Sequence, residues 1–178
     1  MDHTEITERA TANGTMADIE ITGLESAALA EALANGVDHG GNAIEPFVDP
    51  AGGWPLRCCL ADSEPGDEIA IIAWSPFPWR GPYAETGPVV VHTRGCAGSP
   101  VRDRLPDQLD TTPMTLRPYG VDRRIAYDRV RHVPAGDSLM HHLRELLDDP
   151  DVELVHGRNV RGGCYSFQAR LASRSVAA

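Results

Sequence analysis

A glycine pair near the C-terminal end constrains the fold more than any other feature of the chain. Gly162 and Gly163 lie between two runs with strand character, at residues 152–156 and 164–171. Glycine reaches positive φ without steric cost, so a glycine pair between two such runs is typical of a β-hairpin. The sequence therefore predicts that the last two strands are antiparallel neighbours.

The rest of the chain continues this pattern of short strands between turns. Turn-forming residues predict two further hairpins, one joining residues 56–60 to 68–74 and one joining residues 114–119 to 124–130. Asp137 is expected to cap the second of two helices. The remaining predicted elements are strands at residues 18–22 and 88–93 and helices at residues 25–34 and 137–147.

Hairpins outnumber strand–helix–strand units, which favours an α+β fold over a doubly wound parallel sheet. We expect a mostly antiparallel sheet of about six to eight strands, with two main helices and long loops rich in proline and glycine. Residues 1–16 lack apolar periodicity and are expected to be a disordered tail. Residues 17–178 are long enough for one core and contain no linker, so we expect a single α+β domain.

The composition argues against several classes of function. A net charge of −10 would repel a nucleic-acid backbone. No apolar run approaches the roughly 20 residues of a membrane helix, and no basic segment followed by an apolar one marks a secretory signal. We therefore expect a cytoplasmic protein with reduced cysteines, monomeric or homodimeric, with no nucleic-acid and no membrane partner.

The positive charge of the chain is carried entirely by arginine. All sixteen basic residues are Arg, and there is no Lys. This composition excludes a Schiff-base lysine, a phosphate-loop lysine and a lysine general base. Anions must instead be held by guanidinium groups, whose planar fork favours two parallel hydrogen bonds to a carboxylate or phosphate.

The C-terminal hairpin concentrates the polar side chains that could form a site. His156 and Arg158 lie two residues apart on one strand and should share a face, and Asn159 follows where the chain turns. Arg158 could hold an anion, and His156 could transfer a proton near neutral pH. The structural alternative is a histidine satisfied by one hydrogen bond and an arginine in a salt bridge.

Residues from other segments could complete this site. Cys164 is either a nucleophile beside a base or a small buried residue. Glu85, in an aromatic and proline-rich loop, and His92, at the end of a valine-rich strand, are either acid–base groups or a solvated acid and a core histidine. Further ligand-binding candidates are Arg57, Arg117, Tyr83 and Tyr165. A surface salt bridge is the usual role of an arginine on a strand, and the ligand role is favoured only for Arg158 and, more weakly, Arg57.

The cysteines and histidines lack the spacing of common zinc motifs. No Cys-x2-Cys, His-x3-His or His-Glu-x2-His occurs, and the adjacent His141 and His142 would point about 100° apart on a helix. Cys58, Cys59 and Cys96 are interpreted as core or surface thiols. We therefore expect no metal and no cofactor.

Several motifs together resemble a known family. They are Arg57 before a strand, Gly81-Pro-Tyr83 leading to Gly87-Pro88, Leu116-Arg-Pro-Tyr119, and His156-x-x-Asn159-x-x-x-Gly163-Cys164-Tyr165. On these motifs the chain resembles the bacterial domain-of-unknown-function family numbered 1203, from about residue 19 to residue 171. The family has no assigned reaction, so the resemblance implies boundaries and a set of residues. Arg158 stands where other members often carry a second imidazole, which argues against a metal or a histidine pair.

Two classes of function follow from these features. The first is a cofactor-free enzyme for a small anionic metabolite, acting in a biosynthetic tailoring or ring-forming step. In it, Arg158 and Arg57 would hold the anion, and His156, His92 or Glu85 would transfer protons. The second is a non-catalytic metabolite-binding or interaction protein in which the same cluster is structural. An enzyme requires a base and an arginine within about 3–4 Å of one ligand-sized space, whereas a structural cluster is filled by its own salt bridges.

Overall fold

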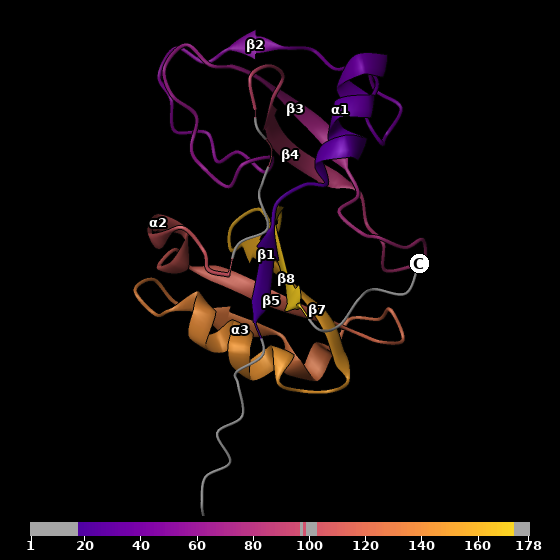
Figure 1. Ribbon diagram of the computed structural model, residues 1–178, viewed down its shortest axis with the longest axis vertical. Coiled ribbons are helices and arrows are strands. Elements are labelled where there is room, and N and C mark those ends of the chain that lie inside the picture. The colour runs from indigo at the N-terminus through magenta and orange to yellow at the C-terminus, as the bar shows by residue number, and fades with distance from the viewer. Residues whose placement is uncertain (1–17, 97, 99–102, 173–178) are drawn as a thin grey trace, which may run out of the picture.

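The computed structural model describes residues 18–96, 98 and 103–172, and the expected tail at residues 1–16 lies outside them. The described residues form an α+β fold with two antiparallel sheets (Figure 1). The larger sheet has the order β1-β8-β7-β5-β6, and the smaller sheet has the order β2-β3-β4. Their strands are β1 (Ile19–Thr22), β2 (Phe47–Val48), β3 (Glu68–Trp74), β4 (Gly87–His92), β5 (Met114–Gly120), β6 (Arg131–Val133), β7 (Val152–Asn159) and β8 (Tyr165–Leu171).

The predicted C-terminal hairpin is confirmed. Strands β7 and β8 are antiparallel, and His156 lies opposite Gln168 in their register. Gly163 has a φ of 68°, a conformation that glycine adopts without the steric cost of a side chain. Strand β7 also pairs with β5, which places Arg117 opposite His156. The polar residues of the two strands are therefore brought together at the centre of the larger sheet.

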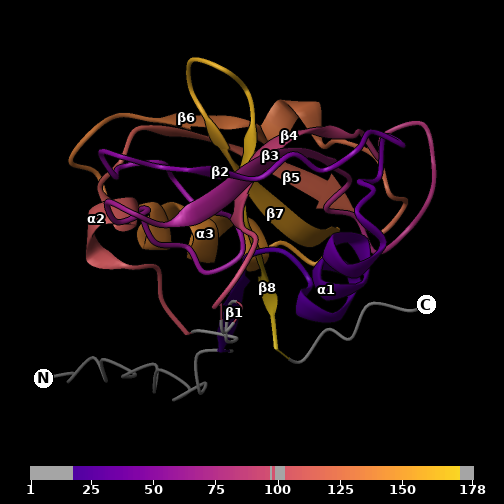
Figure 2. The ribbon, with the colours of Figure 1, turned by 90° about the horizontal axis from the view of Figure 1, so that it is seen from above.

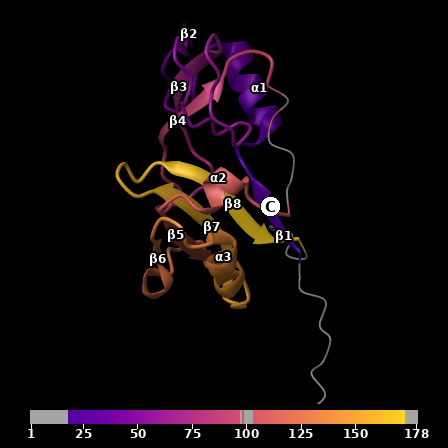
Figure 3. The ribbon, with the colours of Figure 1, turned by 90° about the vertical axis from the view of Figure 1, so that its left-hand side faces the viewer.

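Helix α3 (Leu139–Leu147) covers one face of the larger sheet, and the smaller sheet lies toward the other face (Figure 3). The cap of α3 is Ser138, not the expected Asp137, because the Ser138 hydroxyl accepts a hydrogen bond from the His141 amide. The apolar stripe of α3 is buried against the sheet, and its members are Leu139, Met140, Leu143, Leu146 and Leu147.

The smaller sheet has its own core, against which α1 (Ser26–Asn35) packs (Figures 1 and 2). Strand β3 is central in this sheet, as its apolar sequence predicts. The Glu25 carboxylate caps α1 by accepting hydrogen bonds from two backbone amides, and Gly36 ends the helix in the left-handed conformation. A further short helix, α2 (Asp107–Asp110), precedes β5.

Two predicted strands are wrong. Residues 57–60 form a turn, in which Leu60 has a φ of 61°, and Leu56 makes only an isolated bridge to Val90. Residues 127–129 form a 3-10 turn (η1, Tyr127–Arg129), so the partner strand of β5 begins only at residue 131. In the first case the apolar alternation reflects burial of a loop in the smaller core, which needs no strand pairing.

The aromatic loop at residues 75–86 packs against the larger sheet. Phe77 and Trp79 contact Tyr119, and Leu154 completes this small apolar cluster. The loop thereby holds Glu85 over the strands that carry the arginines. None of the helices in the described part of the chain has the length and apolarity that crossing a bilayer requires.

Candidate functional site

Glu85 binds two of the predicted arginines at once. Its Oε1 lies 2.6 Å from Nη1 of Arg117 and also pairs with Nη2 of Arg158. Arg158 donates further hydrogen bonds to the carbonyl oxygen of Gly163, at 3.1 Å, and to the hydroxyl of Tyr119, at 3.4 Å. Only its Nε has no hydrogen-bond partner. Arg158 is 5% exposed, so most of its hydrogen-bonding capacity is used inside the protein.

His156 is enclosed by aromatic rings. It is fully buried, and the rings of Phe77, Tyr119 and Tyr165 have their centroids 4.7 to 5.0 Å from its own. Neither ring nitrogen has a hydrogen bond of normal geometry. Burial, reinforced by the charge of Arg158, holds the pKa of His156 well below 6.5, against a smaller opposing effect of Gln168. The imidazole is therefore neutral at pH 7 and closed off from solvent.

Cys164 and Glu85 lie on a small hollow with Arg158. This hollow, here called the arginine pocket, has a volume of about 210 Å³, and Gly162, Gly163 and Tyr165 also line it. The thiol of Cys164 is half-buried and donates a weak hydrogen bond to the carbonyl oxygen of Gly162, at 3.7 Å. The structure thus brings together one predicted base, one predicted nucleophile and one predicted anion-binding residue.

Arg57 and Asn159 do not line the arginine pocket. Arg57 is buried behind it, where its Nε donates to the carbonyl oxygen of Tyr165 at 2.6 Å and its Nη1 to that of Pro55 at 3.0 Å. Asn159 stabilises the hairpin turn, because its Oδ1 accepts hydrogen bonds from the amides of Arg161 and Gly162. Both side chains are occupied by backbone groups.

Tyr83 and Tyr165 have different surroundings. Tyr83 makes an edge contact with the ring of Tyr127 beside the aromatic loop. Tyr165 is buried, and its hydroxyl donates to the carbonyl oxygen of Gly23 at 3.1 Å. Burial raises the pKa of Tyr165, which keeps this hydroxyl protonated.

A larger pocket, which sequence reasoning missed, lies between β8 and the start of α1. This inter-sheet pocket has a volume of about 530 Å³. The ring of Trp74 forms part of its wall and stacks on His39 at 3.8 Å, with an angle of 18° between the planes. Other residues that line it include Phe77, Tyr165, Gln168 and Arg170. The aromatic, proline-rich composition of the loop after Trp74 was the available signal, whereas nothing in the sequence pointed to His39.

His92 lies in the smaller sheet, away from the arginine pocket. Its Nδ1 is 3.7 Å from the sulfur of Cys58 and 3.9 Å from that of Cys59. One ligand atom from each of these residues and from Cys96 lies within 4.8 Å of every other. Hydrogen bonding between the adjacent thiols lowers the pKa of Cys59 and raises that of Cys58. We call these four residues the cysteine–histidine cluster; they are the residues in the described chain that could hold a metal.

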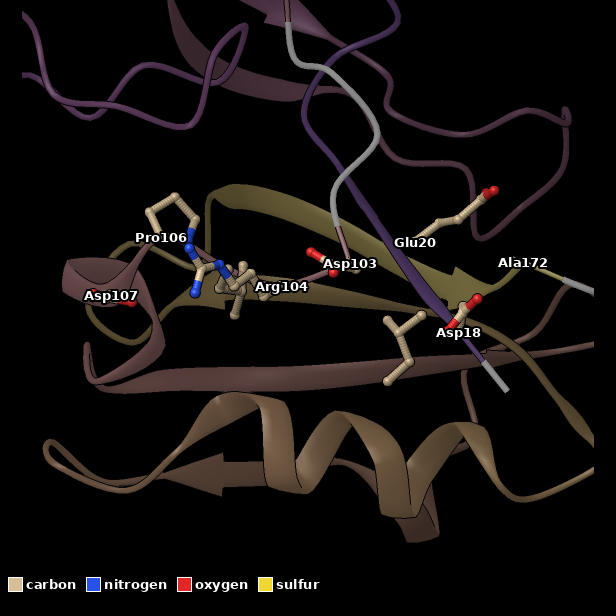
Figure 4. A pocket seen from close by; sticks show the side chains of 9 residues that line it. Asp18, Glu20, Asp103, Arg104, Pro106, Asp107 and Ala172 are labelled. Atoms are coloured by element: carbon tan, nitrogen blue, oxygen red, sulfur yellow. The ribbon is translucent and has the colours of Figure 1, made fainter. Parts of the chain in front are cut away.

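Another hollow, of about 670 Å³, lies at the outer edge of β1 and is rich in acidic residues. Figure 4 shows its carboxylates spread along its length, with Asp107 at one end, Asp103 in the middle and Asp18 at the other end. The Glu20 carboxylate is already paired with Arg170, at 2.7 Å. These groups do not converge on one point, so we assign no site here.

One known protein family matches most of the chain. A family model described as "Protein of unknown function (DUF1203)" matches residues 53–170. The match starts later than the expected residue 19, so β1 and α1 lie outside it. It includes strands β5 and β7, which carry Arg117 and Arg158, and the cysteine–histidine cluster. No curated protein and no solved structure matches the chain.

Proposed function

Because this chain belongs to the DUF1203 family, whose description names no activity, we propose a function from the geometry alone: the protein binds a small, flat, partly apolar molecule in the inter-sheet pocket. The observation that carries this proposal is the pocket itself. Its volume of about 530 Å³ falls within the roughly 300–1,000 Å³ that is typical of small-molecule sites. Such sites combine apolar walls with a few polar groups, and this pocket has both.

The lining of the inter-sheet pocket suggests the chemistry of its ligand. Trp74 and Phe77 offer aromatic surface, on which a planar ring gains energy by stacking or edge contact. Gln168, from the neighbouring strand β8, can fix the orientation of a polar substituent. We therefore propose a heteroaromatic or similarly flat metabolite with at least one hydrogen-bonding group.

The state of the arginines supports binding over catalysis. Arg158 and Arg117 share the Glu85 carboxylate, so the predicted anion-binding cluster is filled by its own salt bridges. His156, the predicted proton-transfer group, is sealed behind aromatic rings. The imidazole of His156 is surrounded by Phe77, Tyr165 and Gln168, which also line the inter-sheet pocket. His156 and these neighbours therefore support one wall of that pocket.

A second candidate function rests on the arginine pocket. Glu85, Arg158 and Cys164 line the same 210 Å³ hollow, and two guanidiniums facing one carboxylate leave excess positive charge. A small anionic metabolite could displace Glu85 from Arg158. The released carboxylate could then serve as a general acid or base, or the Cys164 thiol as a nucleophile, without a cofactor. This arrangement retains the cofactor-free enzyme as the alternative.

Filling the inter-sheet pocket tests the first proposal. Ala28 lines the pocket, whereas Ala27, its neighbour on α1, is exposed. Indole, quinoline and purine serve as probes at millimolar concentration, and thermal unfolding reports their binding. We expect at least one probe to raise the melting temperature of the natural protein and of Ala27→Trp, but not that of Ala28→Trp. Equal stabilisation of both variants, or none of any protein, would refute the proposal.

The alternative is tested with sulfate and succinate. If the arginine pocket is the site, either anion should stabilise the natural protein and lose most of this effect in Arg158→Lys, which keeps the charge but loses the planar fork. Arg129→Lys is the matched control, because Arg129 is paired with Asp149 at the far side of the larger sheet. Stabilisation that is lost equally in both variants would indicate nonspecific charge screening.

A further inference from the structure

The cysteine–histidine cluster is close to the dimensions of a tetrahedral metal site. In such a site zinc is about 2.3 Å from sulfur and about 2.0 Å from nitrogen, so its ligand atoms lie roughly 3.5–3.8 Å apart. Two sulfur–nitrogen distances, 3.7 and 3.9 Å, are close to this range, and the wider limit of 4.8 Å for all four ligand atoms requires that some of them move closer by up to about 1 Å. Small movements of the side chains would therefore complete the coordination shell.

The surroundings of His92 are those of a metal ligand. Its Nε2 lies 3.1 Å from Oδ2 of Asp67, which favours the tautomer with the proton on Nε2. The unprotonated Nδ1 then faces the thiols. The backbone amide of His92 also donates a hydrogen bond to the sulfur of Cys58, at 3.3 Å. A carboxylate behind the imidazole and an amide directed at a sulfur are the outer contacts that orient and tune metal ligands.

The position of the cluster in the fold suggests what a metal would do there. Cys58 and Cys59 come from the turn at residues 57–60, His92 ends β4, and Cys96 lies in the loop that follows. The smaller sheet has only three strands, one of them two residues long, and its core is completed by loops. Small folding units often gain stability from a disulfide or a structural metal, and a metal here would stabilise the smaller sheet in the same way.

We propose that Cys58, Cys59, His92 and Cys96 bind one zinc ion in a structural site that fastens the 57–60 turn to the end of β4. Three sulfurs and one imidazole are a common ligand set of structural zinc sites, and four protein ligands leave no open position for catalysis. This inference does not depend on the proposed ligand-binding function. The ligands come from a pair of adjacent cysteines and, more than thirty residues later, a His-x3-Cys segment. That arrangement is not among the common zinc motifs.

Metal analysis of the full-length protein tests the site directly. After purification under reducing conditions without chelator, inductively coupled plasma mass spectrometry should find about one zinc per chain. Exchange with Co²⁺ should produce the ligand-field and charge-transfer absorption of a tetrahedral, thiolate-bound cobalt. A folded, reduced protein that contains no zinc and takes up neither Zn²⁺ nor Co²⁺ would overturn the proposal. A disulfide among the three cysteines in the native protein, or iron in place of zinc, would do the same.

The fourth cysteine provides a matched control. Cys164 is half-buried in the arginine pocket and is not part of the cluster, so Cys164→Ser should retain full zinc content. Cys59→Ser should lose the zinc, and Asp67→Asn should bind it about 10–100-fold more weakly, since Asp67 only orients a ligand. Should Cys59→Ser fail to fold, Asp67→Asn and the cobalt spectrum of the natural protein still decide the question. Equal zinc loss in Cys164→Ser, or unchanged affinity in Asp67→Asn, would contradict the assignment.

Discussion

At the scale of single residues, Arg158 owes its position to contacts within the chain. Arg158→Ala would remove one of the two cations on Glu85 and leave the Gly163 carbonyl and the Tyr119 hydroxyl without this donor. Breaking a buried ion pair costs about 3–5 kcal/mol, and because Glu85 is half exposed we expect a loss of about 2–3 kcal/mol in unfolding free energy. Urea denaturation measures this quantity.

Arg117→Ala is the control for this prediction. Arg117 is a quarter exposed and shares the same carboxylate, so its replacement should cost less than about 1 kcal/mol. Equal small losses for the two variants would mean that Arg158 has no obligate internal partner. That outcome would favour the arginine pocket as the functional site.

His156 should make the protein less stable in mild acid. Its pKa is near 6.5 in the unfolded chain and lies well below that value in the folded state, where burial disfavours the charged form. The unfolded state therefore binds a proton first as the pH falls, and the stabilisation present above pH 6.5 is lost below it. This loss should reach about 1 kcal/mol between pH 7 and pH 5.5.

Replacing His156 by Phe isolates this effect. The variant keeps a ring in the aromatic cage and removes the titrating group, so its unfolding free energy should fall about 1 kcal/mol less than that of the natural protein between pH 7 and pH 5.5. Urea titrations at the two pH values give the difference, in which other titrating groups cancel. Identical pH dependence in both proteins would show that the pKa of His156 is the same in the folded and unfolded states.

The candidate site was only partly predictable from single residues. His156 and Arg158 were placed on one face by the two-residue period of a strand, and both do contact Tyr119. Glu85 was identified as a candidate acid, but its pairing with Arg117, 32 residues later, depends on how the aromatic loop folds over the sheet. Such a long-range contact leaves no local pattern in the sequence.

At the scale of elements, the packing of β7 on β8 requires glycine at position 157. A Cβ atom built on Gly157 would lie 2.2 Å from the ring of Phe167, which is fully buried. Overpacking of this kind costs about 1–3 kcal/mol, so Gly157→Ala should lower the unfolding free energy by that amount. Gly81→Ala is the control, because its added methyl group would meet no atom within 4 Å. A Gly157→Ala protein as stable as the control would show that the Phe167 ring can move aside.

Strands were predicted correctly where the residues that pair in a sheet are also the residues that are buried. β3, β4, β5, β7 and β8 alternate or are apolar throughout because sheet pairing and burial act on the same residues. Residues 56–60 alternate in the same way, yet Leu56 and Cys58 are buried by a turn. An alternating apolar pattern indicates which side chains are buried. Whether those residues form a strand or a turn depends on tertiary contacts. The same limit hid the cysteine–histidine cluster, whose ligands meet through the turn rather than along one element.

At the scale of the whole molecule, a few buried hydrogen bonds join the two sheets. Arg57 follows the bridge to β4 and donates from Nε to the carbonyl oxygen of Tyr165 in β8. The amide of Leu24, just after β1, donates to the carbonyl oxygen of Arg57 at 2.8 Å. The Tyr165 hydroxyl in turn reaches Gly23. The inter-sheet pocket lies beside this junction, so its shape depends on how firmly the sheets are held together.

Arg57→Met tests whether this junction makes the molecule fold as one unit. Methionine can fill part of the space but leaves the Tyr165 and Pro55 carbonyl oxygens without their donor, at a cost of about 1–3 kcal/mol each. We expect the unfolding free energy to fall by about 3 kcal/mol. We also expect the unfolding transition followed by tryptophan fluorescence to differ from the one followed by far-ultraviolet circular dichroism, because the two coincide only when the protein unfolds as a single cooperative unit. Arg170→Met, on the same strand β8 as Tyr165, removes only a partly exposed pair with Glu20 and should cost less than about 1 kcal/mol with coincident transitions. Coincident transitions in Arg57→Met would show that the sheets stay coupled without the Arg57 side chain.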